Sequence, residues 1–368
     1  MKKKNILKTS LKIIGIVLGI LILALLAYIV YLYASYYRIE DNQELVVEAP
    51  VDDTTTGAAA VLATDTEYSA VTYNIGFGAY LPDYSFFMDG GTSSWAESPE
   101  TVQYAINGAG ELVKSLDPDF ALIQEIDLDA TRSYHTDEYE MLRNILPEYT
   151  TVFAQNYDSA FLFYPFTQPH GSNRAGLGLF SKYPVSSALR RSFPISTSFS
   201  KFFDLDRCYS VSRIPVDNGK ELVIFNLHMS AYGNSDEIRK GQIEMLCNDM
   251  AKEYEAGNYV LCGGDFNHDL KASEEDTESC ESWAFPFPRT ELPEHFAFCL
   301  DLLSSEEQAA LWNSARNADM EYVPGVTYTV TLDGFIISDN IECLSYENVN
   351  TGYSYSDHDP VKVEFMLK

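Results

Sequence analysis

The chain has 368 residues, of which 46% are hydrophobic, and this length suits one large domain or two ordinary ones. Its 54 Asp and Glu against 25 Lys and Arg give a formal net charge of −29. A surface this acidic repels nucleic-acid phosphates unless a metal ion or a local basic patch offsets the field, so the composition disfavours nucleic acid as a partner.

The amino-terminal residues predict a membrane anchor. Residues 1–12 form a basic tail with five lysines, and residues 13–37 are uncharged and largely apolar. At about 1.5 Å per residue such a helix spans roughly 37 Å, more than the hydrocarbon thickness of a bilayer. Because the lysines precede the span, we expect a single-pass protein of a bacterial cell membrane, with a cytoplasmic N-terminus and an extracellular remainder. A cleaved signal peptide is the alternative, and it also exports the domain. Residues 38–66 are polar and simple in composition, which predicts a linker before one domain over residues 67–368.

The six cysteines lack the CxxC spacing that is typical of zinc sites. Cys247 and Cys262 lie in apolar patterns and are expected as buried thiols. A Cys280–Cys299 disulfide is an alternative that the spacing leaves open.

From residue 67 onward, strand-like and helix-like runs follow one another. Helices are expected at residues 98–116, 137–146 and 235–255. Strands are expected at residues 69–74, 119–125, 149–155, 175–182, 208–216, 221–229, 259–262, 335–338 and 361–367. Many strands adjoin without a helix between them, which favours an α+β fold with two mixed, mostly antiparallel sheets and outer helices.

Polar side chains mark the ends of these strands. Four of them close an apolar run, namely Asn74, Glu125, His228 and Asp265, and two positions open one, namely Asp333 and Asp357–His358. If strands of the first kind run antiparallel to strands of the second, all six positions meet at one edge of the paired sheets. The sequence therefore predicts a single polar site there.

The residue types at these positions suit phosphate ester cleavage. The carboxylates of Glu125 and Asp357, with the amide oxygen of Asn74, are hard ligands that fit Mg²⁺ or Mn²⁺ rather than zinc. Asp265 follows two glycines, which let the backbone bring the carboxylate close to a substrate. Asn267 can orient water or a phosphate oxygen.

Imidazoles complete this set of groups. His228 and His358 can donate to phosphoryl oxygens, and Asp333 can hold the tautomer and charge of His358.

Six short motifs resemble, in the same order, those of the endonuclease/exonuclease/phosphatase superfamily. They are Thr72-Tyr-Asn74-Ile, Ile123-Gln-Glu125, Asn226-Leu-His228, Gly264-Asp265-Phe-Asn267, Leu332-Asp333-Gly and Ser356-Asp357-His358. The resemblance implies a four-layer αββα sandwich and a metal-dependent phosphoric ester hydrolase. One departure concerns Asp333, where Leu332 and Gly334 replace the basic and aromatic neighbours that the family often has.

The resemblance also implies a role for each position. Glu125 is implied as the main metal ligand with Asn74 beside it and Asp357 nearby. Asp265 is implied as the base with Asn267 as its partner. His228 is implied on the phosphate, and an Asp333–His358 pair is implied to stabilise the transition state.

The substrate is less constrained by the sequence. His170 and Arg174 are candidate substrate contacts, and Arg132 is a second candidate cation, although ion pairing at the surface is the competing use of both arginines. Three functions stay open: an exported phosphoesterase acting on a small or lipid-linked phosphate ester, a surface nuclease, and an inactive binding module of the same fold. The sparse basic residues weigh against the nuclease.

Overall fold

The computed structural model describes residues 2–52, 61–202, 204–231, 236–272 and 284–368, and divides into two compact units, Met1–Arg38 and Ile39–Lys368. The first unit is the helix α1 (Lys2–Ser35). Its residues Ile6–Ser35 include an 18-residue stretch with a mean hydropathy of 3.1 and are long and apolar enough to cross a membrane, although a signal sequence near an N-terminus has the same properties.

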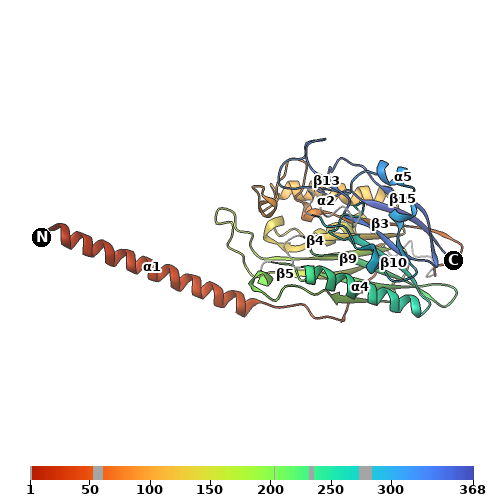
Figure 1. Cartoon of the computed structure of the whole chain (residues 1–368), viewed down its shortest axis with the longest axis horizontal. Helices are drawn as coiled ribbons and strands as arrows, with labels where there is room; N and C mark the ends of the chain where they lie inside the picture. Colours follow the sequence, from red (N-terminus) through yellow and green to blue (C-terminus); the bar gives the residue numbers. More distant parts are fainter. Residues whose placement is uncertain (1, 53–60, 203, 232–235, 273–283) are drawn as a thin grey trace. The chain divides into compact units, whose positions relative to one another are not determined.

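The second unit is built on two seven-stranded sheets (Figure 1). The first sheet has the order β1 (Gln43–Glu44), β7 (Ser187–Ser192), β8 (Cys208–Pro215), β9 (Glu221–His228), β10 (Tyr259–Asp265), β14 (Asp333–Ser338) and β11 (Phe296–Phe298). The second has the order β15 (Ile341–Asn348), β16 (Val361–Leu367), β3 (Glu67–Asn74), β4 (Phe120–Ala130), β6 (Asn173–Ser181), β5 (Thr150–Asp158) and β2 (Val47–Glu48). Within the described residues β9–β10 and β3–β4 are parallel and the other ladders are antiparallel, which confirms two mixed, mostly antiparallel sheets.

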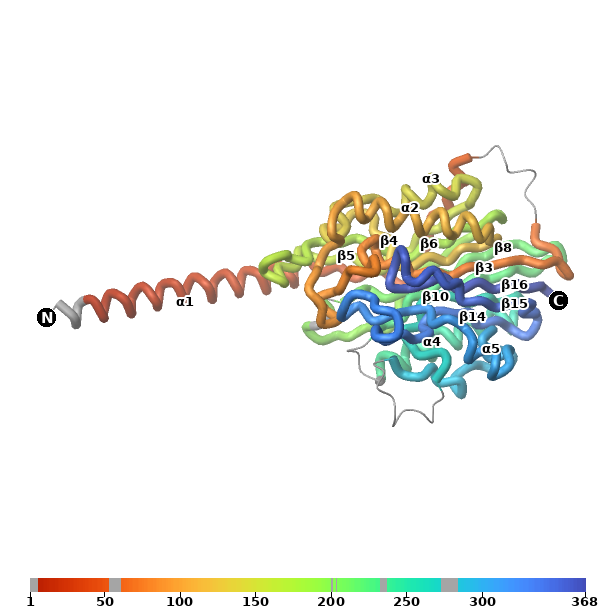
Figure 2. Tube along the Cα trace, turned by 90° about the horizontal axis from the view of Figure 1, so that it is seen from above, coloured from red at the N-terminus to blue at the C-terminus, as the bar shows by residue number. Residues whose placement is uncertain are grey.

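Helices cover the outer faces of both sheets, so the layers run helix, sheet, sheet, helix, as the resemblance implied. Helices α2 (Pro99–Leu116) and α3 (Glu138–Ile145) lie on one side, and α4 (Asp236–Glu255) and the short α5 (Ser305–Ala310) lie on the other (Figure 2). One apolar core fills the space between the sheets, and a second lies under α2 and α3. A two-stranded ribbon of β12 (Ala315–Arg316) and β13 (Thr329–Val330) lies beside the sheets.

Local chemistry sets the ends of the helix α2. Ser98 accepts a hydrogen bond from Thr101 N at 3.1 Å, and Pro99 fills the first helical turn, where no amide donor is needed. At the other end Asp117 adopts a left-handed conformation with φ of 47°. Val102, Ala105, Ile106, Ala109 and Val113 form its buried stripe.

Several strands were missed by the sequence analysis, the longest of them β7 and β15, and β4 is longer than expected. The strand β7 reads Ser-Ala-Leu-Arg-Arg-Ser, and β15 has an edge position with mostly exposed side chains, so neither shows an apolar run. The strand β4 continues past Glu125 because a bulge between Ile123 and Ile126 takes up the turn of the chain at that point.

The predicted linker differs most from the structure, because the compact unit begins at Ile39 rather than at residue 67. Two pieces of that segment are strands: β1 pairs with β7 at the edge of one sheet, and β2 pairs with β5 at the edge of the other. The segment between them packs Leu45 against the core. We call residues 39–48 the strap. Each of its strands has two residues, which is too short to give a period in the sequence.

The described cysteines include four that are buried. Cys247 and Cys262 are buried thiols, as predicted, and Cys208 and Cys299 are buried as well. The proposed Cys280–Cys299 disulfide involves a position outside the described residues.

Candidate active site

The strand register brings the six predicted positions to one edge of the sheets. In the first sheet Asp265 lies beside His228 and opposite Asp333. In the second sheet β3 is antiparallel to β16, so the loop before β16 returns to the end of β3, where Ser356 Oγ donates to Asn74 O at 2.8 Å. The two edges meet where Asn74 Nδ2 donates to Asp265 Oδ2 at 3.0 Å. The predicted convergence is therefore confirmed.

His358 is held as a cation by a buried carboxylate. Its Nδ1 lies 2.7 Å from Asp333 Oδ2, and that oxygen also accepts from Ser314 Oγ at 2.7 Å. Burial alone lowers the pKa of His358, but the charge and hydrogen bond of Asp333, helped by Asp265 and Asp357, raise it well above its ordinary value. The charged imidazole can donate from Nε2 into the pocket. Asp333 thus lies where the resemblance implied, despite its unusual neighbours.

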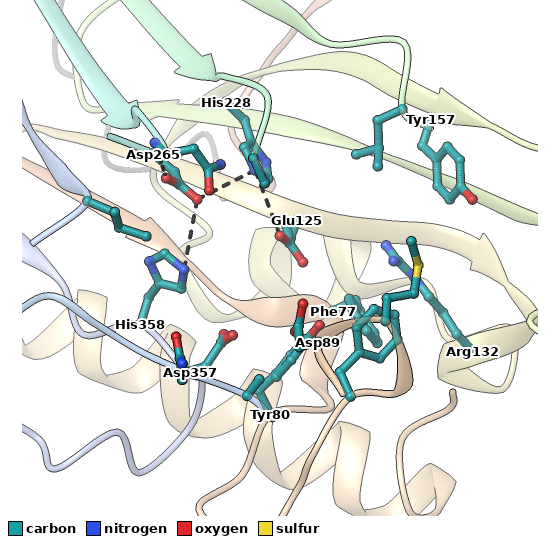
Figure 3. A pocket seen from close by; sticks show the side chains of 18 of the residues that line it. Phe77, Tyr80, Asp89, Glu125, Arg132, Tyr157, His228, Asp265, Asp357 and His358 are labelled. Atoms are coloured by element: carbon teal, nitrogen blue, oxygen red, sulfur yellow. Dashed lines mark hydrogen bonds and ion pairs between the residues drawn. The ribbon is translucent and has the colours of Figure 1, made fainter. Parts of the chain in front are cut away.

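Asp265 sits between two imidazoles. Its Oδ2 lies 3.5 Å from His228 Nε2 and 3.8 Å from His358 Nε2 (Figure 3), and its Oδ1 accepts from Asn267 N at 2.8 Å. Burial raises the pKa of Asp265 to about 7, with the charge of His358 opposing and that of Asp333 adding. A carboxylate that changes protonation near neutral pH suits a general base.

The glycine before Asp265 is required by a close backbone approach. A Cβ on Gly264 would lie 2.0 Å from Leu227 O, and its φ of 147° is rarely adopted by other residues. Asn267 has a φ of 50° and donates from Nδ2 to Met229 O at 3.0 Å, which fixes the amide beside Asp265.

His228 has the opposite charge state from His358. It is buried, its Nε2 lies 3.9 Å from Glu125 Oε1, and its Nδ1 has no partner among the described residues. Burial first, and then the positive charges of Arg207, His358 and Arg132, lower the pKa of His228 well below its ordinary value. A neutral imidazole therefore lies on one side of Asp265 and a charged one on the other.

A group of carboxylates faces the same pocket. Glu125 and Asp89 point toward each other with Asp357 beside them (Figure 3). Burial raises the pKa of Asp89 to about 7 and that of Asp357 to about 6, and the charge of Glu125 adds to both. Glu125 has a φ of 57°, a strained conformation of the kind that gathers at functional sites. Oxygen donors that oppose one another's ionisation fit a hard divalent cation.

The ligand atoms of Asp265, Asp333 and His358 also lie within 4.8 Å of one another, so this cluster can bind a metal too. The contact with Asp333 raises the pKa of His358, however, and so favours the protonated ring, which is no metal ligand, over the neutral one. The chemistry of the donors therefore favours the Glu125 side of the pocket.

Asn74 does not face this group as a ligand. Its Nδ2 donates to Glu125 Oε1 at 3.2 Å as well as to Asp265, while its Oδ1 accepts from Gly76 N at 3.0 Å. Turning the amide around would bring two donors together at Gly76. In this structure Asn74 therefore ties the two carboxylates together, and its oxygen is used by the backbone.

The pocket itself is a cavity of about 400 Å³. Of the two predicted substrate contacts, His170 lines it, with a pKa lowered to about 3 by burial. Arg174 is half exposed, pairs with Asp129 at 3.1 Å and is not among the lining residues. Arg132 lines the pocket, but its guanidinium makes a bidentate ion pair with Asp127.

Sequence reasoning missed four charged residues that line the pocket: Asp89, Asp204, Arg207 and Arg316. They lie in loops, in a short 3-10 turn and in the two-residue strand β12, none of which gives a strand pattern in the sequence. For Asp89 the available signal was the aromatic and glycine-rich character of residues 80–97. The aromatic side chains Phe77, Tyr80 and Phe86 form much of the apolar lining.

Comparisons with known proteins agree with this architecture. The solved structures similar in fold include the endonuclease/exonuclease/phosphatase from Beutenbergia cavernae (TM-score 0.54, 15% identity, covering 82% of this chain and 72% of that one). They also include D. rerio TDP2 complexed with single-strand DNA product (TM-score 0.54, 14% identity, covering 82% of this chain and 99% of that one). A third is the human Nocturnin catalytic domain with bound sulfate anion (TM-score 0.52, 17% identity, covering 82% of this chain and 95% of that one). A search of curated proteins found no match. The model of the Endonuclease/Exonuclease/phosphatase family matches residues 71–302, and the chain belongs to this family, whose members are hydrolases of phosphodiester bonds.

Proposed function

We propose that the domain is a metal-dependent phosphoric ester hydrolase in which water attacks phosphorus in line. The observation that carries this proposal is the placement of Asp265 between a neutral and a charged imidazole, in a pocket that also holds opposed carboxylates. Base, proton donor and cation ligands are the parts that such a reaction needs.

Glu125 and Asp357 would hold the cation, with Asp89 as a further carboxylate near it. A bound Mg²⁺ or Mn²⁺ supplies positive charge to the phosphoryl oxygens. Asn74 keeps Glu125 and Asp265 at a fixed separation through its two hydrogen bonds.

The chain's own residues handle the proton and the growing negative charge. Asp265 accepts the proton of the attacking water, and Asn267 fixes its orientation. His358 donates from Nε2 to a phosphoryl or leaving oxygen, while Asp333 keeps its Nδ1 protonated. His228, as a neutral ring whose Nε2 faces Asp265, donates a hydrogen bond without adding a charge.

We further propose that α1 anchors the protein in a membrane, with its N-terminus in the cytoplasm and the domain outside a bacterial cell. The favoured substrate is a small or lipid-linked phosphate ester, because the net charge of −29 opposes a polyanion. A nuclease is the second candidate, and the fold likeness to a TDP2 structure with a DNA product favours it.

The test is hydrolysis of a panel of phosphate esters by the purified chain, with Mg²⁺, with Mn²⁺ and with EDTA. We expect metal-dependent release of p-nitrophenol from bis(p-nitrophenyl) phosphate, lost in Asp265→Asn and kept in Asp301→Asn, whose carboxylate pairs with Arg289 away from the pocket. Equal activity of wild type and Asp265→Asn on every ester would leave the inactive binding module as the better explanation. Salt-sensitive nicking of plasmid DNA would favour the nuclease function. Release of headgroups from lipid vesicles would favour a lipid-linked phosphate ester as the substrate.

A further inference from the structure

Arg207 is a buried arginine in the pocket with nitrogens that lack hydrogen bonds. It is 7% exposed and lines the cavity, and its Nε and Nη1 have no acceptor among the described residues. A buried guanidinium with unused donors is unfavourable unless water or a ligand supplies the acceptor. Its positive charge also reaches His228, where it is the largest influence on that pKa after burial.

The other two arginines of the pocket are engaged by protein groups, although Arg316 Nε also has no acceptor among the described residues. Arg132 is neutralised by Asp127. Arg316 donates from its terminal nitrogens to backbone carbonyl oxygens, among them Leu81 O at 2.9 Å and Asn317 O at 3.0 Å. Among the described pocket residues, Arg207 is therefore the arginine whose guanidinium is best placed to accept a new anion.

The backbone of Arg207 is fixed from both sides. Its own carbonyl oxygen accepts from Phe193 N at 2.9 Å, and the preceding carbonyl, of Asp206, accepts from Arg190 Nη2 at 2.9 Å. Arg190 is fully buried and also donates to Glu40 O at 3.1 Å, which ties this segment to the strap. A residue held this firmly, with free donors, is preorganised for binding.

The strand order separates Arg207 from the reacting edge. It directly precedes β8, and β9 lies between β8 and the strand β10 that ends in Asp265. Two spacings of about 4.8 Å place the backbones about 10 Å apart. His358 lies beyond Asp265 from Arg207, whereas Glu125 lies near His228. At this backbone separation from Asp265, we expect Arg207 to face a part of the substrate other than the phosphoryl group that is attacked.

We propose that the guanidinium of Arg207, whose Nε and Nη1 lack acceptors among the described residues, binds a second anionic group of the substrate, a phosphate or a group of like geometry. Each planar edge of a guanidinium pairs Nε or Nη1 with Nη2, and such an edge suits two oxygens of a tetrahedral anion. The preferred substrate is then an ester that carries another phosphate next to the one that is cleaved. This assignment depends on the proposed hydrolase function in one respect, because it takes the bound anion to be part of the ester that is hydrolysed.

Anion binding tests the site without any hydrolysis. The full chain, in detergent and without divalent metal, is titrated with inorganic phosphate and inorganic pyrophosphate by calorimetry. We expect binding that weakens about 10-fold or more in Arg207→Gln and less in Arg207→Lys, which keeps the charge and loses the fork. Arg289→Gln removes the same charge from an Asp301 ion pair outside the pocket and should bind as wild type does. Thermal melts check that each variant is folded.

Steady-state kinetics then test whether the anion bound by Arg207 is part of the substrate. For thymidine 3′-phosphate 5′-(p-nitrophenyl phosphate), Arg207→Gln should raise KM with little change in kcat, and this rise in KM should be several-fold larger than any rise for bis(p-nitrophenyl) phosphate, which has no second anion. Phosphate binding that is absent in wild type, or equal in wild type and Arg207→Gln, overturns the proposal. If the chain hydrolyses no ester, the proposed function fails while the binding titration still decides on Arg207.

Discussion

Replacing Asp333 by Asn should disable the charged imidazole of the site. The 2.7 Å contact with His358 Nδ1 is buried on both sides. At an effective dielectric constant of 20, two unit charges about 4 Å apart interact by about 4 kcal/mol. Without this carboxylate, burial dominates and the pKa of His358 falls, so the ring loses its charge near neutral pH. Losing one preorganised donor of this kind lowers kcat by about 10²- to 10³-fold.

The matched control is Asp339→Asn. Asp339 Oδ2 lies 2.7 Å from His295 Nδ1, the same distance as in the buried pair, but both side chains are about half exposed and outside the pocket. The assay is the pH profile of kcat/KM on bis(p-nitrophenyl) phosphate. A kcat/KM for Asp333→Asn within a few-fold of wild type, or an equal loss in Asp339→Asn, would falsify the role given to the pair.

The Asp333–His358 pair should also make the stability of the protein depend on pH. The folded-state pKa of His358 is raised above its unfolded value, so the contribution is complete below the unfolded pKa of about 6.5 and is lost as pH rises through the folded pKa. The difference in the free energy of unfolding between wild type and Asp333→Asn should therefore be largest near pH 6 and shrink in alkaline solution. Urea unfolding at a series of pH values measures it.

Three further changes test other parts of the structure. Burial, and then the charge of Asp127, raise the pKa of Glu138 well above its ordinary value, so the stabilising contribution of the protonated Glu138 is lost as pH rises through that pKa. The Tm of wild type should therefore fall from pH 5 to pH 9 more than the Tm of Glu138→Gln. Parallel Tm curves of the two proteins would argue against this assignment. Glu125→Gln should weaken Mn²⁺ binding by about 10- to 100-fold or more in calorimetric titrations, since even residues that only hydrogen-bond to a metal ligand have effects of that size. Unchanged Mn²⁺ binding would show that Glu125 is not a ligand of the cation. A chain that begins at residue 39 should keep the stability of the domain, whereas a chain that begins at residue 67 loses the strap and with it two hydrogen-bond acceptors of the buried Arg190. The free energy of unfolding of the shorter chain, measured in urea, should be lower by about 3 kcal/mol or more. Equal stability of the two chains would show that the strap is dispensable.

Strand patterns and motifs were sufficient to predict the sheets and the place where their polar ends meet. The prediction worked because a short apolar run that stops at a polar residue marks both a strand and its end, and antiparallel pairing then brings Asp333 beside Asp265. It failed for β7, where Arg190 is buried by hydrogen bonds to backbone oxygens rather than by apolar contacts. It also failed for the strap, which owes its place to pairing at two sheet edges.

Within the site, the sequence predicted which residue types are present better than it predicted their hydrogen bonding and protonation. Asn74 was predicted to be an oxygen ligand, and only the hydrogen bond from Gly76 shows which way its amide points. Asp89 and Arg207 depend on how loops fold back over the sheets, and single-sequence patterns carry no information on such contacts.

The two histidines show how strongly the surroundings decide chemistry. Both are buried, and burial lowers the pKa of each ring. For His358 the buried carboxylate of Asp333 overcomes that effect, whereas for His228 no carboxylate lies at Nδ1 among the described residues, and the nearby arginines add to it. Because the two pKa values move in opposite directions, the site keeps one neutral and one charged donor on either side of Asp265 across the neutral pH range. Such a division lets the carboxylate accept a proton on one side without taking it from the cation on the other, which is the condition that a base and an acid in one pocket must meet.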